Sequence, residues 1–292
     1  MSSSALDILA IAAHRDDVEQ TCGGTLLKMA QRGRRTGILD LTQGEMGTRG
    51  SAQERAAEAA EAARILQVSW RRALDIPDGR VENTWENRLK VARVIREQRP
   101  RVVILPYWQG RHPDHYTASV LGYEACFLAG LAKLGRAAVS TQQSALSRKT
   151  RVGSPGPEAG EGPAVGGREY GFTRGAPDAE EQAALAAVAG LPPHRPFKII
   201  YATLYYDIRP SFVVDITDQF EGRLQSIHAY KSQFTDQAPG AGDFPAHAEI
   251  RDRVATMAGF YGLLAGVKYA EPFLQKEVEL VEDLLEIPVK SI

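Results

Sequence analysis

The chain has 292 residues, and its 43% apolar and 24% charged content is typical of a globular protein with one or two domains and a sizeable core. Its formal net charge of −1 argues against a nucleic-acid partner, and no apolar run approaches the roughly 20 residues of a membrane helix. The N-terminus lacks a basic signal segment, and the two cysteines, Cys22 and Cys126, form neither a disulfide framework nor a cysteine zinc site, so we expect a cytoplasmic protein.

The first 135 residues alternate strand-like and helix-like segments. Apolar runs predict four strands, at Leu6–Ala13, Thr36–Thr42, Ser69–Leu74 and Arg101–Tyr107. Longer segments with helical spacing predict four helices, at Glu19–Arg32, Ala52–Leu66, Glu86–Gln98 and Tyr116–Leu134. This alternation indicates parallel βαβ units, and therefore an α/β fold with a doubly wound, mostly parallel, Rossmann-like sheet that has helices on both faces.

The pattern is interrupted at about residues 137–193, where Gly, Pro and Ala dominate. We expect an insertion there, either a surface loop or a lid, with a short helix at Ala179–Ala189. Beyond it the sequence predicts strands at Lys198–Tyr206 and Ser211–Thr217 and helices at Phe220–Tyr230 and Ala246–Leu264. Because this part is short and supplies only two clear strands, we expect residues 1–292 to form a single catalytic domain.

Two predicted strands end in residues that can bind metals. The first is followed by His14, Asp16 and Asp17, and the fourth by "HPDH" with His112, Asp114 and His115; these residues are grouped here as the strand-end cluster. In open α/β sheets, ligands bind beyond the carboxyl ends of the parallel strands, so the two groups are expected to meet. Imidazole and carboxylate ligands suit Zn²⁺, with Fe²⁺, Mn²⁺ and Co²⁺ as alternatives.

Each motif alone has an ordinary structural explanation. Asp16 or Asp17 could cap the helix that follows, and "HPDH" could be a surface turn in which Asp114 bonds its own backbone. A dinucleotide site is the main rival, because "GGT" follows the first strand, but G-x-G-x-x-G is missing and two aspartates would repel a pyrophosphate. There is no G-x-S-x-G elbow or P-loop. The joint position of both motifs at strand ends therefore favours a metal site.

These residues resemble a known family. "AHRDD" followed by "GG", with "HPDH" about a hundred residues later, is similar to the PIG-L/LmbE-like metal-dependent N-acetylglucosaminide deacetylases. Further blocks, including "LTQGEMGTRGSAQERAAEA", "LPPHRP", "PSFVVDIT", "AYKSQF" and "GVKYAEPF", resemble the bacillithiol-biosynthesis branch. The resemblance covers most of the chain outside the insertion. One departure is Arg15, which stands where the family usually has proline or alanine, beside the expected ligands but not among them.

The resemblance implies a role for each residue of the strand-end cluster. His14, Asp17 and His115 would bind the metal, and Asp16 would act as general base. A cationic His112, oriented by Asp114, would stabilise the oxyanion together with the metal. Three protein ligands leave a position open for water, whose pKa a metal lowers towards about 7. A neighbouring carboxylate can then take the water's proton, and either Asp16 or His112 can protonate the leaving amine.

The resemblance also suggests a substrate and an assembly. It implies a zinc-dependent hydrolase that releases acetate from a small N-acetylglucosaminide, foremost N-acetylglucosaminyl malate, and that forms a homo-oligomer, with a hexamer as one candidate. Arg55, Arg195 and Glu45 would contact this substrate, the arginines by pairing with its carboxylates. Alternatives are a chitobiose-like or mycothiol-like glucosaminide, a thiol-conjugate amidase, or a catalytically silent carbohydrate-binding protein.

Overall fold

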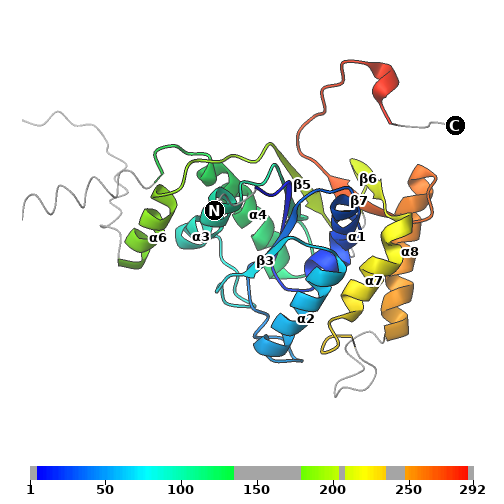
Figure 1. Cartoon of the computed structure of the whole chain (residues 1–292), viewed down its shortest axis with the longest axis horizontal. Coiled ribbons are helices and arrows are strands. Elements are labelled where there is room, and N and C mark those ends of the chain that lie inside the picture. Colours follow the sequence, from blue (N-terminus) through cyan, green and yellow to red (C-terminus); the bar gives the residue numbers. More distant parts are fainter. Residues whose placement is uncertain (1–4, 135–178, 204–207, 235–246, 289–292) are drawn as a thin grey trace, which may run out of the picture.

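A seven-stranded sheet lies at the centre of the molecule, with strand order β3-β2-β1-β4-β5-β7-β6 (Figure 1). The structure is a computed structural model that describes residues 5–134, 179–203, 208–234 and 247–288. The strands are β1 (Ile8–Ala12), β2 (Thr36–Asp40), β3 (Trp70–Ala73), β4 (Val102–Pro106), β5 (Lys198–Ala202), β6 (Phe212–Asp215) and β7 (Ala270–Leu274). The first five are parallel to one another, while β7 is antiparallel to both of its neighbours, so the expected mostly parallel sheet is confirmed.

The helices cover both faces of this sheet, as expected for a doubly wound fold (Figure 1). One face carries α3 (Trp85–Gln98), α4 (Pro113–Ala129) and α6 (Ala179–Ala189). The other carries α1 (Asp17–Gln31), α2 (Ala52–Ile65), α7 (Phe220–His228) and α8 (His247–Ala265). Two short 3-10 turns lie at η1 (Thr217–Gln219) and η2 (Leu284–Glu286). Within the described ranges, no helix is both long and apolar enough to cross a bilayer.

The predicted insertion can be compared with the structure only at its end. Residues 135–178 lie outside the described part of the chain. The short helix expected at Ala179–Ala189 is confirmed as α6, and it packs on α3. The buried guanidinium of Arg96 in α3 donates to the carbonyl oxygens of Val188 at 2.8 Å and Leu191 at 3.2 Å, and so attaches the end of the insertion to the domain.

Strand β1 is apolar without alternation because both of its faces are buried. Leu9 and Ile11 belong to the core that includes α3 and α4, whereas Ala10 and Ala12 belong to the core beneath α1. A strand of this kind has no solvent-facing side. Polar side chains can therefore reach water only beyond its carboxyl end, where His14 follows.

Strand β7 was not predicted, because Glu271 and Pro272 interrupt its apolar pattern. The carbonyl of Phe273 accepts from the backbone N–H of Ser211, on the β6 side. The nitrogen of the preceding Pro272 therefore faces β5, whose paired residues end at Ala202, opposite Phe273. The proline consequently occupies a position where the sheet requires no donor.

Glu271 is fully buried and supports an irregularity in α1. That helix is kinked at Cys22, where φ is −145°. The Glu271 carboxylate accepts from the freed backbone N–H groups of Gly24 at 2.8 Å and Thr25 at 2.7 Å, and it lies 3.1 Å from Nε of Arg223. A Cβ on Gly24 would lie only 2.9 Å from the side chain of Ile216, which directly follows β6. Glycine is therefore required where α1 approaches the end of that strand. The kink thus has a buried anion at the start of its second segment.

Candidate active site

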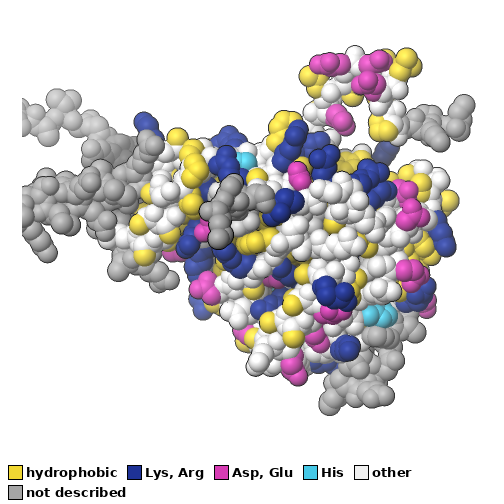
Figure 2. Space-filling model, viewed as in Figure 1, with side chains coloured by type: hydrophobic (Ala, Val, Ile, Leu, Met, Phe, Trp, Pro, Cys, Tyr) yellow, Lys and Arg dark blue, Asp and Glu magenta, His cyan; other side chains and the backbone are white. Residues whose placement is uncertain are grey.

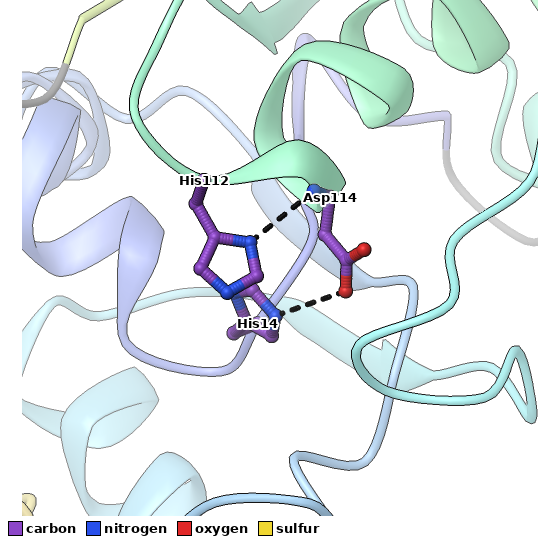
Figure 3. Close-up of side chains that lie close together, drawn as sticks. All are labelled: His14, His112 and Asp114. Atoms are coloured by element: carbon purple, nitrogen blue, oxygen red, sulfur yellow. Dashed lines mark hydrogen bonds and ion pairs between the residues drawn. The ribbon is translucent and has the colours of Figure 1, made fainter.

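Loops from four adjacent parallel strands meet at one edge of the sheet, named here the carboxyl edge. His14, Asp16 and Asp17 follow β1, Glu45 follows β2, Asp78 follows β3, and "HPDH" follows β4. The chain reverses its direction of winding between β1 and β4, and ligands of doubly wound folds bind at such a switch point. The expected meeting of the two motifs is found: Figure 3 shows His14 beside His112 and Asp114.

Three potential ligand atoms converge at this edge. Nδ1 of His14 lies 3.2 Å from Nε2 of His115, and the Asp17 carboxylate lies 3.4 Å from the first nitrogen and 3.1 Å from the second. One ligand atom from each of these residues falls within 4.8 Å of the others. Two imidazoles and one carboxylate in a partly buried cluster form a donor set that zinc and similar divalent metals accept. These residues therefore fit the expected metal.

The other ring nitrogen of His14 is surrounded by carboxylates. Its Nε2 lies 3.1 Å from Asp78. The same nitrogen lies 3.4 Å from Asp114, and Figure 3 shows this ion pair. A metal-binding histidine commonly uses its second nitrogen in this way, which fixes the ring and its tautomer. Asp78 was missed by the sequence analysis because "PDG" is typical of a turn, and nothing local indicates that its side chain reaches β1.

The carboxylates around His14 strongly favour a positive charge in the cluster. Burial alone would lower the pKa of His14, but Asp17, Asp114 and Asp78 together raise it to about 12. Burial would likewise raise the pKa of Asp17, yet His115 and His14 hold it well below its ordinary value. Without a metal, a proton on an imidazole supplies this positive charge. A divalent cation between the same atoms would supply it in place of the proton, which is a second sign that the site fits a metal.

Asp16 is oriented for a role other than helix capping. It is the N-cap residue of α1, yet its side chain makes no capping bond. Instead one oxygen accepts from Nη2 of Arg55 at 2.9 Å and the other from the side-chain amide of Gln20 at 3.0 Å. Burial and the neighbouring Asp17 raise the pKa of Asp16, while Arg55 opposes this shift. A carboxylate with a raised proton affinity, adjacent to the possible ligands, is well suited to accept a proton.

The "HPDH" motif forms the start of α4 and is not a loop. The helix begins at Pro113, three residues before the predicted Tyr116, because His112 caps it: Nδ1 of His112 accepts from the backbone N–H of Asp114 at 3.2 Å. That bond leaves Nε2 as the protonated nitrogen of an exposed, neutral ring. Burial together with His14 and His115 lowers the pKa of His112, which also favours the neutral donor over the expected cation.

Asp114 contacts His112 through its backbone N–H, while its carboxylate accepts hydrogen bonds from other groups. The two oxygens accept from the backbone N–H groups of Gly79 at 2.9 Å and Val81 at 3.2 Å, besides facing His14. The carboxylate therefore joins the loop after β3 to the start of α4. It orients the ring of His14, where the sequence analysis expected it to orient His112.

The three expected substrate contacts have different environments. Arg55 reaches the cluster, but it is buried and its guanidinium binds Asp16 and the carbonyl of Gly44. Glu45 lies exposed beside the cluster, and its carboxylate accepts from the backbone N–H of Asp78 at 2.8 Å. Arg195 precedes β5, at the opposite edge of the sheet, and lies over the ring of Phe127. The structure therefore brings Arg55 and Glu45 to the cluster but does not bring Arg195 there.

Two side chains from distant segments hold the turn between His14 and Asp16. The carbonyl oxygen of Arg15 accepts from Nη2 of Arg71 in β3 and from the hydroxyl of Tyr230, which follows α7. Arg71 is itself fixed by Asp40 at 2.9 and 3.0 Å and by Glu19 at 2.6 Å. Sequence analysis could not identify these supports, because contacts across 56 and 215 residues leave no local pattern. The side chain of Arg15 turns away and donates to the carbonyl of Ala52 at 2.6 Å.

A cavity of about 400 Å³ adjoins the cluster. Asp17, His112 and His115 line one side of it, and the ends of β1, β4 and β5 form an apolar floor that includes Ile11, Ile104 and Ala202. Arg111 and Gln109 lie at its polar side, in the loop before α4. The cavity is large enough for a small organic molecule, which would then lie against the possible ligand atoms.

Comparisons with known proteins identify relatives of this chain. Residues 9–126 match the family model of PIG-L, GlcNAc-PI de-N-acetylase. Diacetylchitobiose deacetylase from Thermococcus kodakarensis is 29% identical over 276 residues, which cover 90% of this chain and 80% of that protein. The uncharacterized deacetylase YaiS of Escherichia coli is 33% identical over 40% of this chain and 72% of its own length. The crystal structure of the conserved protein TT1542 from Thermus thermophilus is 34% identical, with a TM-score of 0.68 and coverage of 95% of this chain and 98% of that one.

Proposed function

The chain belongs to the PIG-L, or GlcNAc-PI de-N-acetylase, family, and we propose that it is a metal-dependent N-deacetylase acting on a small N-acetylglucosaminide. The reaction adds water across the amide C–N bond and releases acetate and a free amine. The observation that carries the proposal is the convergence of His14, Asp17 and His115 directly beside Asp16. A pure carbohydrate-binding protein would have no use for a proton acceptor at that position.

His14, Asp17 and His115 would hold the metal, with His14 fixed from behind by Asp78 and Asp114. A divalent ion bound there would supply a Lewis acid that lowers the pKa of a water molecule towards about 7. Asp16 would accept a proton from the water molecule that attacks the amide carbon. The Arg55 guanidinium holds the Asp16 carboxyl group in place while Asp16 gains and then loses a proton.

His112 serves the developing oxyanion. Because its Nδ1 is occupied by the start of α4, its Nε2 carries the proton and is the nitrogen free to donate. Donors of this kind lower a barrier by about 2.7–4 kcal/mol. The leaving nitrogen needs one proton. Asp16, which has just received one from water, is the group that supplies it, because the neutral His112 ring could give up its Nε2 proton only by becoming an imidazolate.

For the substrate we propose N-acetylglucosaminyl malate, on the resemblance of several sequence blocks to the bacillithiol branch. The exposed Arg111, which lines the cavity, offers a guanidinium for a malate carboxylate. The specific alternative is a chitobiose-type disaccharide, which is favoured by the similarity to the diacetylchitobiose deacetylase. Zinc is the proposed metal, with Fe²⁺, Mn²⁺ and Co²⁺ as competitors for the same donor set.

The first experiment combines metal content, by mass spectrometry, with acetate release from both candidate substrates. Wild type is compared with His115→Ala and with the control His194→Ala, whose ring bonds the Pro100 carbonyl far from the cluster. We expect wild type and the control to bind one metal per chain and release acetate, and His115→Ala to lose both. Metal binding without release from either substrate would contradict the proposed substrates. Absence of metal after reconstitution would contradict the mechanism.

A further inference from the structure

The segment after β7, residues 276–288, projects from the body of the molecule and is called here the C-terminal arm (Figure 1). Its apolar side chains are almost fully exposed: Val278 is 97%, Leu280 87%, Leu284 80% and Leu285 93% accessible. Figure 2 shows the arm as hydrophobic and acidic side chains that stand clear of the rest of the surface. Four large aliphatic side chains exposed on one short segment are unfavourable in water and mark an interaction site.

The arm is attached to the body at its base and has a capped turn near its tip. The first residue, Lys276, lies with its ammonium 4.8 to 4.9 Å from the ring centroids of Tyr123, Trp108 and Tyr201. Near the tip, η2 is capped by Asp283, whose side chain accepts from the backbone N–H of Leu285 at 2.9 Å. The cap places Leu284 and Leu285 together in one turn at the end of the arm.

A complementary surface lies at the amino edge of the same chain, the edge opposite the cluster. A cleft of about 550 Å³ is lined there by Tyr123, Phe127, Arg195, Phe197 and Lys198, together with the base of the arm. It is named the amino-edge cleft. Phe197 is 76% exposed, and the guanidiniums of Arg101 and Arg195 lie over the rings of Phe197 and Phe127. Away from Glu277 and Glu279 at the base of the arm, the cleft is therefore aromatic and basic.

The cleft continues into an apolar stripe on α4. Tyr116, Val120, Tyr123 and Phe127 are exposed and follow one another at spacings of four, three and four residues. This spacing places them on a single face of the helix, which turns away from the sheet. The stripe leads from the carboxyl edge to the cleft and enlarges the surface that a partner could cover.

The arm and the cleft match in charge as well as in polarity. Of the arm's acidic residues, Glu277 and Glu279 line the cleft at the base, while Glu282, Asp283 and Glu286 lie around the leucines near the tip. The cleft offers the exposed Arg195 and Lys198, and the exposed Arg101 lies beside it over the ring of Phe197. Opposite charges around an apolar contact direct association and fix its register. An acidic, aliphatic arm and a basic, aromatic cleft on one chain thus form a self-complementary pair.

The tip of the arm does not enter the amino-edge cleft of its own chain. Residues Glu277–Leu280 already line that cleft at the base of the arm, and from there the arm leads away from the body to η2 (Figure 1). We propose that Leu284 and Leu285 of one chain dock in the amino-edge cleft of a second copy, which returns its own arm in the same way. A two-fold pair of this kind satisfies both surfaces with a single set of contacts. It leaves the carboxyl edge of each chain open.

Cysteine cross-linking tests which chain receives the arm. Tagged Phe197→Cys and untagged Leu285→Cys chains are co-expressed, oxidised mildly and separated without reductant; the native Cys22 and Cys126 are buried. We expect a disulfide between a tagged and an untagged chain. Glu61→Cys on α2, in place of Phe197→Cys, should give no such product, and neither should Leu285→Cys with a tagged wild-type chain. No link between the two variants would overturn the proposal, as would a link confined to one chain in the double variant Phe197→Cys/Leu285→Cys.

Light scattering across a dilution series measures the energetic consequence. The double variant Leu284→Asp/Leu285→Asp should weaken self-association roughly 100-fold, because two buried leucines are replaced by charges. Met46→Asp, which changes an equally exposed apolar side chain at the carboxyl edge, should leave association unchanged. Equal association of wild type and the leucine variant would overturn the proposal.

Discussion

The two edges of the sheet use charged residues in opposite ways. At the carboxyl edge, the aspartates of the site are buried or half-buried and are held by other charged groups and by backbone N–H groups, as Asp114 is by Gly79 and Val81. At the amino edge, arginines lie exposed over aromatic rings, as Arg195 does over Phe127. The first arrangement fixes each group before any ligand arrives, which is what catalysis needs. The second keeps large apolar surfaces near water, which suits association.

The difference has a structural origin. The loops after β1 to β4 all leave the sheet at this edge, so their side chains meet there and can bind one another, as the Asp78 carboxylate does with the backbone N–H of Met46. The amino edge receives the end of α4, the residues before β5 and the chain leaving β7. Those segments arrive from different parts of the chain, and the room left between them forms the amino-edge cleft.

Among changes that leave the proposed metal ligands in place, replacing Asp16 with asparagine should have the largest effect on activity. The amide keeps the shape of the carboxylate and an oxygen for Arg55, but it cannot take a proton. We expect the kcat for acetate release to fall by about 10²–10⁴-fold, with metal content unchanged because His14, Asp17 and His115 remain. Steady-state kinetics and mass spectrometry on the same preparation measure both quantities. Unchanged kcat would remove Asp16 as the base, and wild type without turnover would favour a binding protein.

Glu271→Ala should have the largest effect on stability. The change leaves two backbone N–H groups at the α1 kink and the Arg223 guanidinium without their buried anion. Loss of one partner from a buried pair costs about 3–5 kcal/mol, measured as the free energy of unfolding in urea. Glu277→Ala, the same substitution on the exposed arm, should stay within about 0.5 kcal/mol of wild type. Similar effects of the two changes would mean that burial does not distinguish the two regions.

The local sequence pattern accounts for much of the fold and for the composition of the cluster. β1 is apolar on both faces and ends at His14, so its period and its end were readable, as was α6 from its alanine-rich run. The start of α4 was placed three residues late, because a histidine acts as its cap. β7 was missed because Glu271 serves α1 and not the sheet.

The orientation of the side chains could not be read from the sequence. Which nitrogen of His14 faces Asp78 depends on a contact across 64 positions, and the role of Arg71 depends on three segments at once. Arg55 and Arg195 looked equivalent as motif residues, yet they lie at opposite edges. Pattern and resemblance name the residues of such a site, whereas tertiary packing decides what each one contacts.

Comparing Arg55→Ala with Arg195→Ala sharpens the contrast between the edges. Loss of the Arg55 guanidinium removes a charge-assisted hydrogen bond from Asp16, and such bonds contribute about 1.5–3 kcal/mol. We therefore expect kcat/KM to fall roughly 10- to 100-fold for Arg55→Ala and to change less than about twofold for Arg195→Ala. Equal losses would show that Arg195 reaches a site after all, through a second copy of the chain.

Glu19→Gln tests whether Arg71 is paired with one or two ionised carboxylates beneath the carboxyl edge. Among these variants it has the smallest expected effect. Glu19 is fully buried, and within the described residues its Oε2 has no hydrogen-bond partner. Asp40 takes two bonds from Arg71, and burial raises the pKa of Glu19 to about 7 despite the attraction of Arg71.

A carboxyl whose pKa is raised on folding stabilises the protein fully below its unfolded value near 4.5, and this contribution is lost as the pH rises through about 7. The unfolding free energy of wild type minus that of Glu19→Gln should thus fall by roughly 1–3 kcal/mol from pH 4.5 to 7. Urea unfolding of both proteins at several pH values measures this difference. A difference that grew with pH would mean that Glu19 is ionised and that Arg71 neutralises both carboxylates.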